Sequence, residues 1–296
     1  MKLHSFLLIL TFISLSTFTI QAQDLEALMD QTEKKQINYT TAAFKTTRVI
    51  NLHSIENTHK GVLDFRISHR FGQLNSGWRD LWGLDNAMIR FNFEYGISDD
   101  LMIGLSRSTY QKTYEGYFKY KLLKQSTGAI EIPFTLSLYS NVGVNTVEAP
   151  AERQPGFENR LSFTNSIIIG RKFNDKLSLQ LNPIHVHKNM VTKANESNDV
   201  LAIGTGGRYK VSNRVALTAE YIYLVPDETL PQINGVDPVN SFSVGVDIET
   251  GGHVFQLHLT NSVAMVDKAF VSETTSKWGD GGIYFGFNIM RAFQIN

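Results

Sequence analysis

The stretch Asn86–Gly96 reads NAMIRFNFEYG, and its side chains alternate between two chemical classes. One alternate set is apolar and largely aromatic: Ala87, Ile89, Phe91, Phe93 and Tyr95. The opposite set includes Arg90 and Glu94. Successive side chains of a β-strand point to opposite faces, so a strand here has one apolar and one charged face. In a soluble sheet the apolar face meets a core, whereas in a membrane barrel it meets lipid and the charged face lines the lumen.

The same alternation recurs along the chain from Gly61 onward and predicts twelve strands. They cover residues 62–71, 86–96, 101–108, 113–122, 130–142, 161–173, 177–185, 200–210, 215–225, 242–249, 253–263 and 283–295. Pro133 falls inside the fifth of these and would remove one ladder hydrogen bond. An even number of antiparallel strands is typical of single-chain bacterial outer-membrane barrels.

The connections between these strands alternate in length, with one exception at residues 109–112. Short periplasmic turns and long outside loops are typical of outer-membrane barrels, and twelve strands then leave both chain ends on the short-turn side. Aromatic residues on the apolar face also gather near both strand ends, as interfacial girdles do. A soluble sandwich would instead have to bury one apolar face for each of twelve strands. The pattern favours an all-β, transmembrane, antiparallel up-and-down barrel, with a soluble exported β protein as the alternative.

The N-terminal residues predict export and divide the chain into three parts. Lys2 precedes an apolar, Ser/Thr-rich run, and Ala22 is a small residue at the position before a cleavage site, as in a secretory signal peptide. We therefore expect a signal peptide over residues 1–22, a periplasmic arm or plug over 23–60 and the barrel over 61–296. Residues 24–35 have the spacing of a short amphipathic helix, capped by Asp24.

The composition excludes several classes of function. Lys and Arg together equal Asp and Glu in number, 28 each, so the chain lacks the basic footprint of nucleic-acid binding. Cysteine is absent, which rules out disulfides, thiol catalysis and Cys-ligated zinc. We expect no cofactor. Outer-membrane lipid and a small solute are the expected partners.

The polar strand faces carry both signs of charge. The residues predicted to line the lumen are Arg66, Arg70, Arg90, Glu94, Glu115, Lys119, Arg208, Glu220, Asp247 and His258. The same face also includes Asp64, Lys121, Glu131, Lys210 and Glu249. Twelve strands fall between barrels filled by side chains and water-filled porins. These charges could form a salt-bridge network that closes the lumen, or they could line a narrow pore.

Two histidine patterns have the residue types of a chemical site. His185 and His187 share one strand face and could bind a metal together, but no third ligand has a recognisable spacing, so no metal site is predicted. His258 and Ser262 share a face but stand roughly 13 Å apart along one strand, too far for a catalytic hydrogen bond. No nucleophile-elbow, Walker or zinc-protease motif is present. The chain is therefore predicted not to be an enzyme, and an outer-membrane enzyme acting on lipid is the alternative.

Tryptophans mark two of the long loops. Trp78 and Trp82 lie in the first long loop, and Trp278 lies in the last. Exposed tryptophans could anchor a binding site or stack on sugars, or they could seal the barrel mouth by packing on each other. Sealing is the preferred interpretation.

Two strand segments carry a family resemblance. At Lys60–Gly72 (KGVLDFRISHRFG) and Thr250–Ser262 (TGGHVFQLHLTNS) the chain resembles an uncharacterised bacterial outer-membrane β-barrel family, defined as a domain of unknown function. The resemblance implies a barrel in the outer membrane and supplies no catalytic residues. We expect a narrow channel or binding protein for a small solute, or a structural surface protein.

Overall fold

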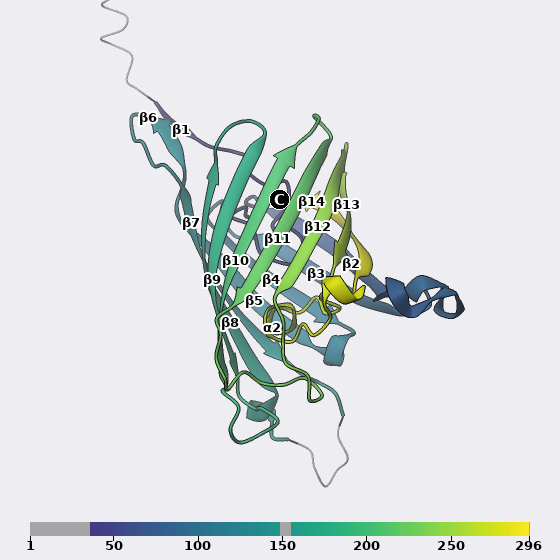
Figure 1. Ribbon diagram of the computed structural model, residues 1–296. Coiled ribbons are helices and arrows are strands. Elements are labelled where there is room, and N and C mark those ends of the chain that lie inside the picture. Colours follow the sequence, from purple (N-terminus) through teal and green to yellow (C-terminus); the bar gives the residue numbers. More distant parts are fainter. Residues whose placement is uncertain (1–35, 149–154, 296) are drawn as a thin grey trace, which may run out of the picture. The chain divides into compact units, whose positions relative to one another are not determined.

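A computed structural model describes residues 36–148 and 155–295 (Figure 1). The predicted signal peptide over residues 1–22 and the predicted helix over 24–35 lie outside the described residues. The described chain falls into two compact units, a small one and a large one. In the small unit, β1 (Ile37–Tyr39) pairs antiparallel with β6 (Ser126–Gly128). Gly128 has a φ of 96°, and a side chain there would collide with the carbonyl oxygen of Gln36.

The large unit is a closed barrel of twelve antiparallel strands, as predicted. The strands are β2 (Val62–Gln73), β3 (Ala87–Gly96), β4 (Leu101–Ser108), β5 (Tyr114–Leu123), β7 (Thr135–Val144), β8 (Leu161–Lys172), β9 (Leu177–Lys188), β10 (Asp199–Lys210), β11 (Val215–Leu224), β12 (Ser241–Thr250), β13 (His253–Thr260) and β14 (Tyr284–Gln294). Each pairs with its neighbours in chain order, and the pairing of β14 with β2 closes the barrel. Closure leaves no unpaired sheet edge, which is what a membrane requires of a spanning sheet.

One predicted strand is misplaced. The fifth was expected over residues 130–142, whereas β7 runs from Thr135 to Val144. Residues 126–131 belong to the small unit, and Glu131 is exposed and lies outside β7, so the prediction that it belongs to the polar face of this strand is wrong. Pro133 lies just before β7, where its missing N–H interrupts no ladder.

The two faces of the barrel wall differ as the opening stretch predicts. Phe91 and Phe93 on β3 are 42% and 47% exposed, whereas Arg90 and Glu94 between them are 3% and 0% exposed. Phe65 on β2 stacks on Phe93 with ring centroids 4.9 Å apart, on this same outer face. The apolar side chains thus point outward, and the charged ones point into the barrel.

Short helical turns occupy several of the connections between strands. They are η1 (Leu74–Ser76), η2 (Trp78–Gly83), η3 (Tyr110–Lys112), η5 (Phe157–Arg160), α2 (Asp267–Ser272) and η6 (Trp278–Asp280). Within residues 36–148 and 155–295, no helix combines the length and apolar character needed to cross a bilayer.

Two segments outside the strands lie within the barrel. The first, residues 43–58, precedes β2 and is called the N-terminal segment. The second, residues 261–276, lies between β13 and β14, contains α2 and is called the inserted loop. Most side chains of both are buried, with Val49 at 1% exposure and Val266 at 0%. The N-terminal segment contacts residues from β2, β5, β9, β11 and β13, so strands surround it.

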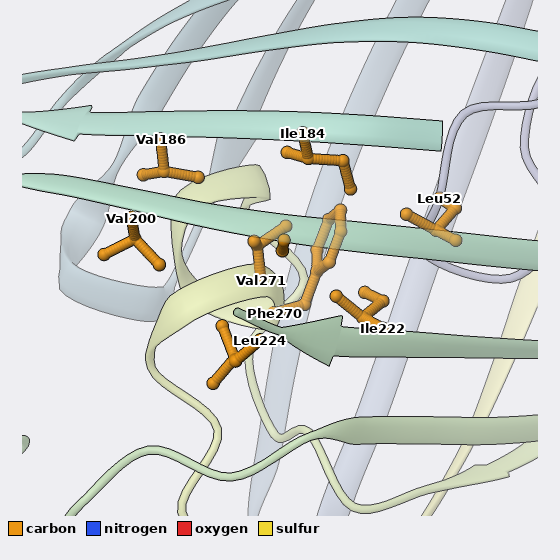
Figure 2. Close-up of a cluster of buried hydrophobic side chains, with 9 residues drawn as sticks. Leu52, Ile184, Val186, Val200, Ile222, Leu224, Phe270 and Val271 are labelled. Carbon is orange, nitrogen blue, oxygen red and sulfur yellow. The ribbon is translucent and has the colours of Figure 1, made fainter. Parts of the chain in front are cut away.

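The inserted loop packs on one wall of the barrel through a hydrophobic cluster (Figure 2). Phe270 and Val271 of α2 face apolar side chains of β9, β10 and β11. The wall residues of this cluster are Ile184, Val186, Val200, Ala202, Ile222 and Leu224. Leu52 of the N-terminal segment joins the same cluster, so both segments contribute to one apolar core inside the barrel.

Candidate functional site

The interior of the barrel is the candidate site, and its charged wall residues hold the two segments. All ten residues predicted to line the lumen are buried, with exposures of 7% or less. Their role as the lining of a solute path remains a prediction. In the present conformation their polar atoms contact other protein groups, which we describe from the N-terminal segment outward.

Glu220 on β11 binds the main chain of the N-terminal segment. One carboxylate oxygen accepts hydrogen bonds from the backbone N–H groups of Ile50, Asn51 and Leu52 at 3.1, 2.9 and 3.0 Å. The other accepts from the Asn51 side-chain amide at 2.7 Å. Consecutive N–H groups that converge in this way form an anion-binding concavity. A carboxylate of the wall therefore fixes the turn of the segment.

Lys119 on β5 binds the same segment with the opposite charge. Its ammonium group donates to the carbonyl oxygens of Thr47 at 3.2 Å, Ser54 at 2.9 Å and Glu56. An ammonium has three N–H donors, so these contacts satisfy it completely. Two neutral side chains of the wall bind further carbonyl oxygens of the segment. Gln180 donates to the carbonyl oxygen of His53, and Gln256 donates to that of Val49. The wall thus binds mainly main-chain atoms of the segment.

A second group of wall residues surrounds Thr47 and Asn51. Glu94 accepts hydrogen bonds from the Thr47 hydroxyl and from Tyr117, the latter at 2.7 Å. Arg66 donates to Thr47 at 3.4 Å. Arg70 donates to Asn51 at 3.0 Å and to the carbonyl oxygen of Ser262 at 2.6 Å. Arg70 therefore contacts both the N-terminal segment and the inserted loop.

The two segments meet directly at one ion pair. Arg48 of the N-terminal segment lies 3.2 Å from Asp267 at the start of α2, and both are almost fully buried. Asn141 on β7 donates to Asp267 at 2.8 Å, and Tyr139 donates to the same carboxylate. Burial would raise the pKa of Asp267, but the cations Arg48 and Arg90 hold that pKa below its usual range.

Wall charges also fix the beginning of α2. Arg90 on β3 pairs with Glu115 on β5 at 2.6 Å and donates to the carbonyl oxygen of Met265 at 2.7 Å. Glu115 in turn accepts from the backbone N–H of Asp267 at 2.9 Å. The cavity lined by Leu52, His53, Asp267 and Phe270 measures about 20 Å³, room for about one water molecule. The segments therefore fill this part of the lumen.

The candidate catalytic pair is not assembled. The His258 ring lies 2.9 Å from a guanidinium nitrogen of Arg70, and the Ser262 hydroxyl donates to the Ala264 carbonyl oxygen at 3.3 Å. No hydrogen bond joins the two side chains, in agreement with their spacing in the sequence. The alternative of lipid hydrolysis by this pair loses its geometric basis.

The histidine pair has a partner that the sequence pattern missed. His185 and His187 each place a ring nitrogen 2.8 Å from the same oxygen of Asp199. Asp199 begins β10 and lies directly opposite His187 in the sheet, so no sequence spacing marks it. Within the described residues, no group of three or more acidic or histidine side chains has an arrangement suited to a metal ion.

The tryptophans do not form the predicted seal. Trp78 and Trp82 are 73% and 55% exposed, so the preferred interpretation, in which they pack on each other over the mouth, is wrong. Trp278 packs on Phe242 with ring centroids 5.2 Å apart and donates its indole N–H to the Phe242 carbonyl oxygen.

Sequence reasoning also missed Arg48, Asp267 and the apolar patch under α2. A signal for the patch exists, because inward positions turn apolar at the long-loop ends of three neighbouring strands. These positions include Ile184 on β9, Val200 on β10 and Ile222 on β11. An apolar stretch on a lumen face predicts an apolar partner inside the barrel.

Comparison with solved structures shows the fold. An outer-membrane channel from Pseudomonas putida F1 is similar with a TM-score of 0.51 and 13% identity, over 81% of this chain and 98% of that one. The KdgM porin is similar with a TM-score of 0.47 and 9% identity, over 78% of this chain and 99% of the porin chain. Outer membrane phospholipase A from Escherichia coli is similar with a TM-score of 0.41 and 10% identity, over 80% of this chain and 91% of the phospholipase chain.

Comparison of the sequence with family models assigns the chain. No curated protein sequence matches it. A family model described as a membrane bound beta barrel domain matches residues 44–293, which include the N-terminal segment from its second residue onward. This match covers most of the chain and agrees with the closed barrel and its outward apolar face. The chain therefore belongs to the membrane bound beta barrel domain family (DUF5777), and it is an outer-membrane β-barrel.

Proposed function

We propose that this barrel is a gated channel for a small solute, closed by the N-terminal segment and opened when that segment leaves the lumen. The observation that carries the proposal is the bonding of Lys119 and Glu220. Throughout the described chain, every hydrogen bond of these two side-chain charges ends on the N-terminal segment. Neither charge is needed to hold neighbouring strands together.

The chemistry of the interior supports a lumen that can become wet. Removing a carboxylate or ammonium group from water is costly, and well-packed apolar residues often serve equally well or better in a permanently closed interior. Buried charges such as Lys119 and Glu220 are therefore better explained by a state in which water or solute reaches them. The hydrogen-bonded wall remains closed in that state, because the segment contributes no barrel strand.

Planar-bilayer conductance of the purified protein tests this function. The main variant replaces residues 43–58 with a flexible Gly/Ser linker of equal length, so that β2 keeps its connection. We expect long closed periods for the unaltered protein and a steady conductance for the variant. The exchange Asn75→Ser in the first long loop, outside the lumen, is the matched control and should behave like the unaltered protein.

The linker variant must be shown to be folded before its conductance is interpreted. Two measurements provide that check. A folded barrel resists unfolding in detergent-containing gel sample buffer unless it is boiled, and its circular-dichroism spectrum is that of a β protein. If the variant fails to fold, Lys119→Met combined with Glu220→Gln weakens the same contacts and replaces it. A folded variant that leaves the bilayer sealed at all voltages overturns the proposal and favours a structural surface role.

A further inference from the structure

We propose that the connection between β2 and β3, residues 74–86, inserts its apolar side chains into the outer leaflet of the membrane. This connection is called the tryptophan loop. Four of its exposed side chains are large and apolar: Trp78 at 73%, Leu81 at 48%, Trp82 at 55% and Leu84 at 43%. Such a cluster on a protein surface marks an interaction site. The question is which partner its chemistry fits.

The backbone of the tryptophan loop is shaped to present these side chains. Leu81 and Trp82 have φ values of 45° and 51°, in the left-handed region that is uncommon for residues with large side chains. The backbone N–H of Trp82 donates to the Gly77 carbonyl oxygen at 2.8 Å. Gly83 is buried at the base, where an added side chain would lie 2.5 Å from the Gly72 backbone. The base of the turn is thus tightly packed while its tip carries exposed indoles.

The loop continues a surface that already faces lipid. On the outer face of β2 and β14, Phe71 stacks with Phe285 at 5.7 Å between ring centroids. His69 and Phe287 stack beside them at 5.0 Å. The strand β2, which carries Phe71 and His69, continues directly into the tryptophan loop (Figure 1). Long connections of outer-membrane barrels lie on the outer side, so the loop emerges next to the outer leaflet.

The composition of the loop distinguishes lipid from other partners. Tryptophan is favoured at the boundary between headgroups and acyl chains because its ring is apolar and its N–H is polar. Leu81 and Leu84 would gain from acyl chains but have no aromatic face to stack on a sugar. The loop has one cation, Arg79, and two anions, Asp80 and Asp85. Insertion into the apolar layer, and not attraction to phosphate, therefore drives the contact.

Tryptophan fluorescence of the full chain in lipid vesicles tests the proposal. Trp278→Phe leaves Trp78 and Trp82 as the emitting residues, since the chain has 3 Trp. In pure phospholipid vesicles we expect a blue-shifted emission, loss of quenching by aqueous iodide, and stronger quenching by lipids brominated near the headgroup than by lipids brominated near the chain end. The matched control, Trp78→Phe with Trp82→Phe, reports Trp278 alone.

The absence of cysteine offers an independent measurement. Leu84→Cys introduces a single thiol for a polarity-sensitive dye and leaves all tryptophans in place. We expect the dye to report an apolar environment in vesicles, and a dye on Ser76→Cys to report a more polar one. Iodide quenching of Trp78 and Trp82 as strong in vesicles as for free tryptophan, with no effect of brominated lipid, would overturn the proposal. It would reassign the loop to a glycan or protein partner.

Discussion

The N-terminal segment and the inserted loop fill the same lumen but are held by different combinations of polar and apolar contacts. Charged and amide side chains of the wall bind the main chain of the N-terminal segment, with Glu220 at the tip of its turn and Lys119 at the base. Val49 and Ile55 of the segment also pack in an apolar cluster with Ile168 of the wall. The inserted loop packs on an apolar wall through Phe270 and Val271, and its Asp267 also forms an ion pair with Arg48. Water can replace hydrogen bonds, whereas it cannot replace apolar contacts without loss of the hydrophobic effect.

This difference assigns distinct roles to the two segments. We infer that the inserted loop is a permanent part of the barrel interior and that the N-terminal segment is the exchangeable part. The three predictions that follow test these roles, because each changes one kind of contact and measures the response expected of the segment that it holds.

The largest effect is expected at the apolar contact. Phe270→Ala removes a side chain that is 2% exposed and leaves a cavity against β9 and β11. We expect the free energy of unfolding in detergent or vesicles to fall by about 3–5 kcal/mol. Denaturant titration followed by circular dichroism measures it. Phe157→Ala, at a position 68% exposed, is the control and should change little. Equal stability of both variants would mean that the loop is not part of the stable core.

A smaller and local effect is expected at the polar contact. Glu220→Gln keeps the shape of the side chain but turns an amide N–H₂ group toward the N–H groups of residues 50–52. Buried donors left without an acceptor cost about 1–3 kcal/mol. We expect faster amide hydrogen exchange at residues 50–52 and an unchanged denaturation midpoint of the barrel. Exposed Glu228→Gln is the control. A lower midpoint without local exchange would contradict the proposed exchangeability of the segment.

The smallest effect is expected from lowering the pH through the neutral range, which should leave the inserted loop in place. Burial would raise the pKa of Glu273, but Lys268 and Lys188 hold that pKa below its usual range, as Arg48 and Arg90 do for Asp267. A carboxyl whose pKa is lowered on folding stabilises the fold above its ordinary pKa, about 4 in unfolded chains, and loses that contribution as the pH falls through its folded value.

Hydrogen exchange of residues 261–276, corrected for the intrinsic pH dependence of exchange, measures this contribution. We expect constant protection from pH 8 to about 5 and a loss only below the ordinary carboxyl pKa of about 4. A loss of protection between pH 7 and 5 would show that groups other than Asp267 and Glu273 hold the loop.

The sequence predicts the barrel because strand alternation is a local property. The alternation of Arg90 and Phe91 determines which face of β3 points outward, and this does not depend on what lies across the lumen. The loop lengths indicate which end of each strand is on the outer side of the membrane. The exception at Glu131 also has a local origin, since the apolar alternation of residues 130–134 lies before β7 and begins in the small unit. Periodicity alone does not separate such an extension from a strand.

The filling of the lumen could not be predicted in the same way. Glu220 binds backbone N–H groups of Ile50, Asn51 and Leu52, and backbone groups carry no sequence signature. Arg48 and Asp267 are separated by 219 residues, so their contact depends on the closed barrel. Inward apolar residues such as Ile222 do carry a signal, because a lumen face has no reason to be apolar unless something packs on it.

The positions of the two inserted segments along the chain have a consequence for assembly. Residues 43–58 lie shortly before β2, and residues 261–276 lie in the connection that leads from β13 into β14, so each belongs to a stretch of chain that enters one strand of the seam that closes the cylinder. While that seam is open, Arg48 and Asp267 belong to opposite margins of a curved sheet. Their pairing adds a side-chain link between the stretches that enter the first and last strands, so it is expected to favour closure of the seam during assembly.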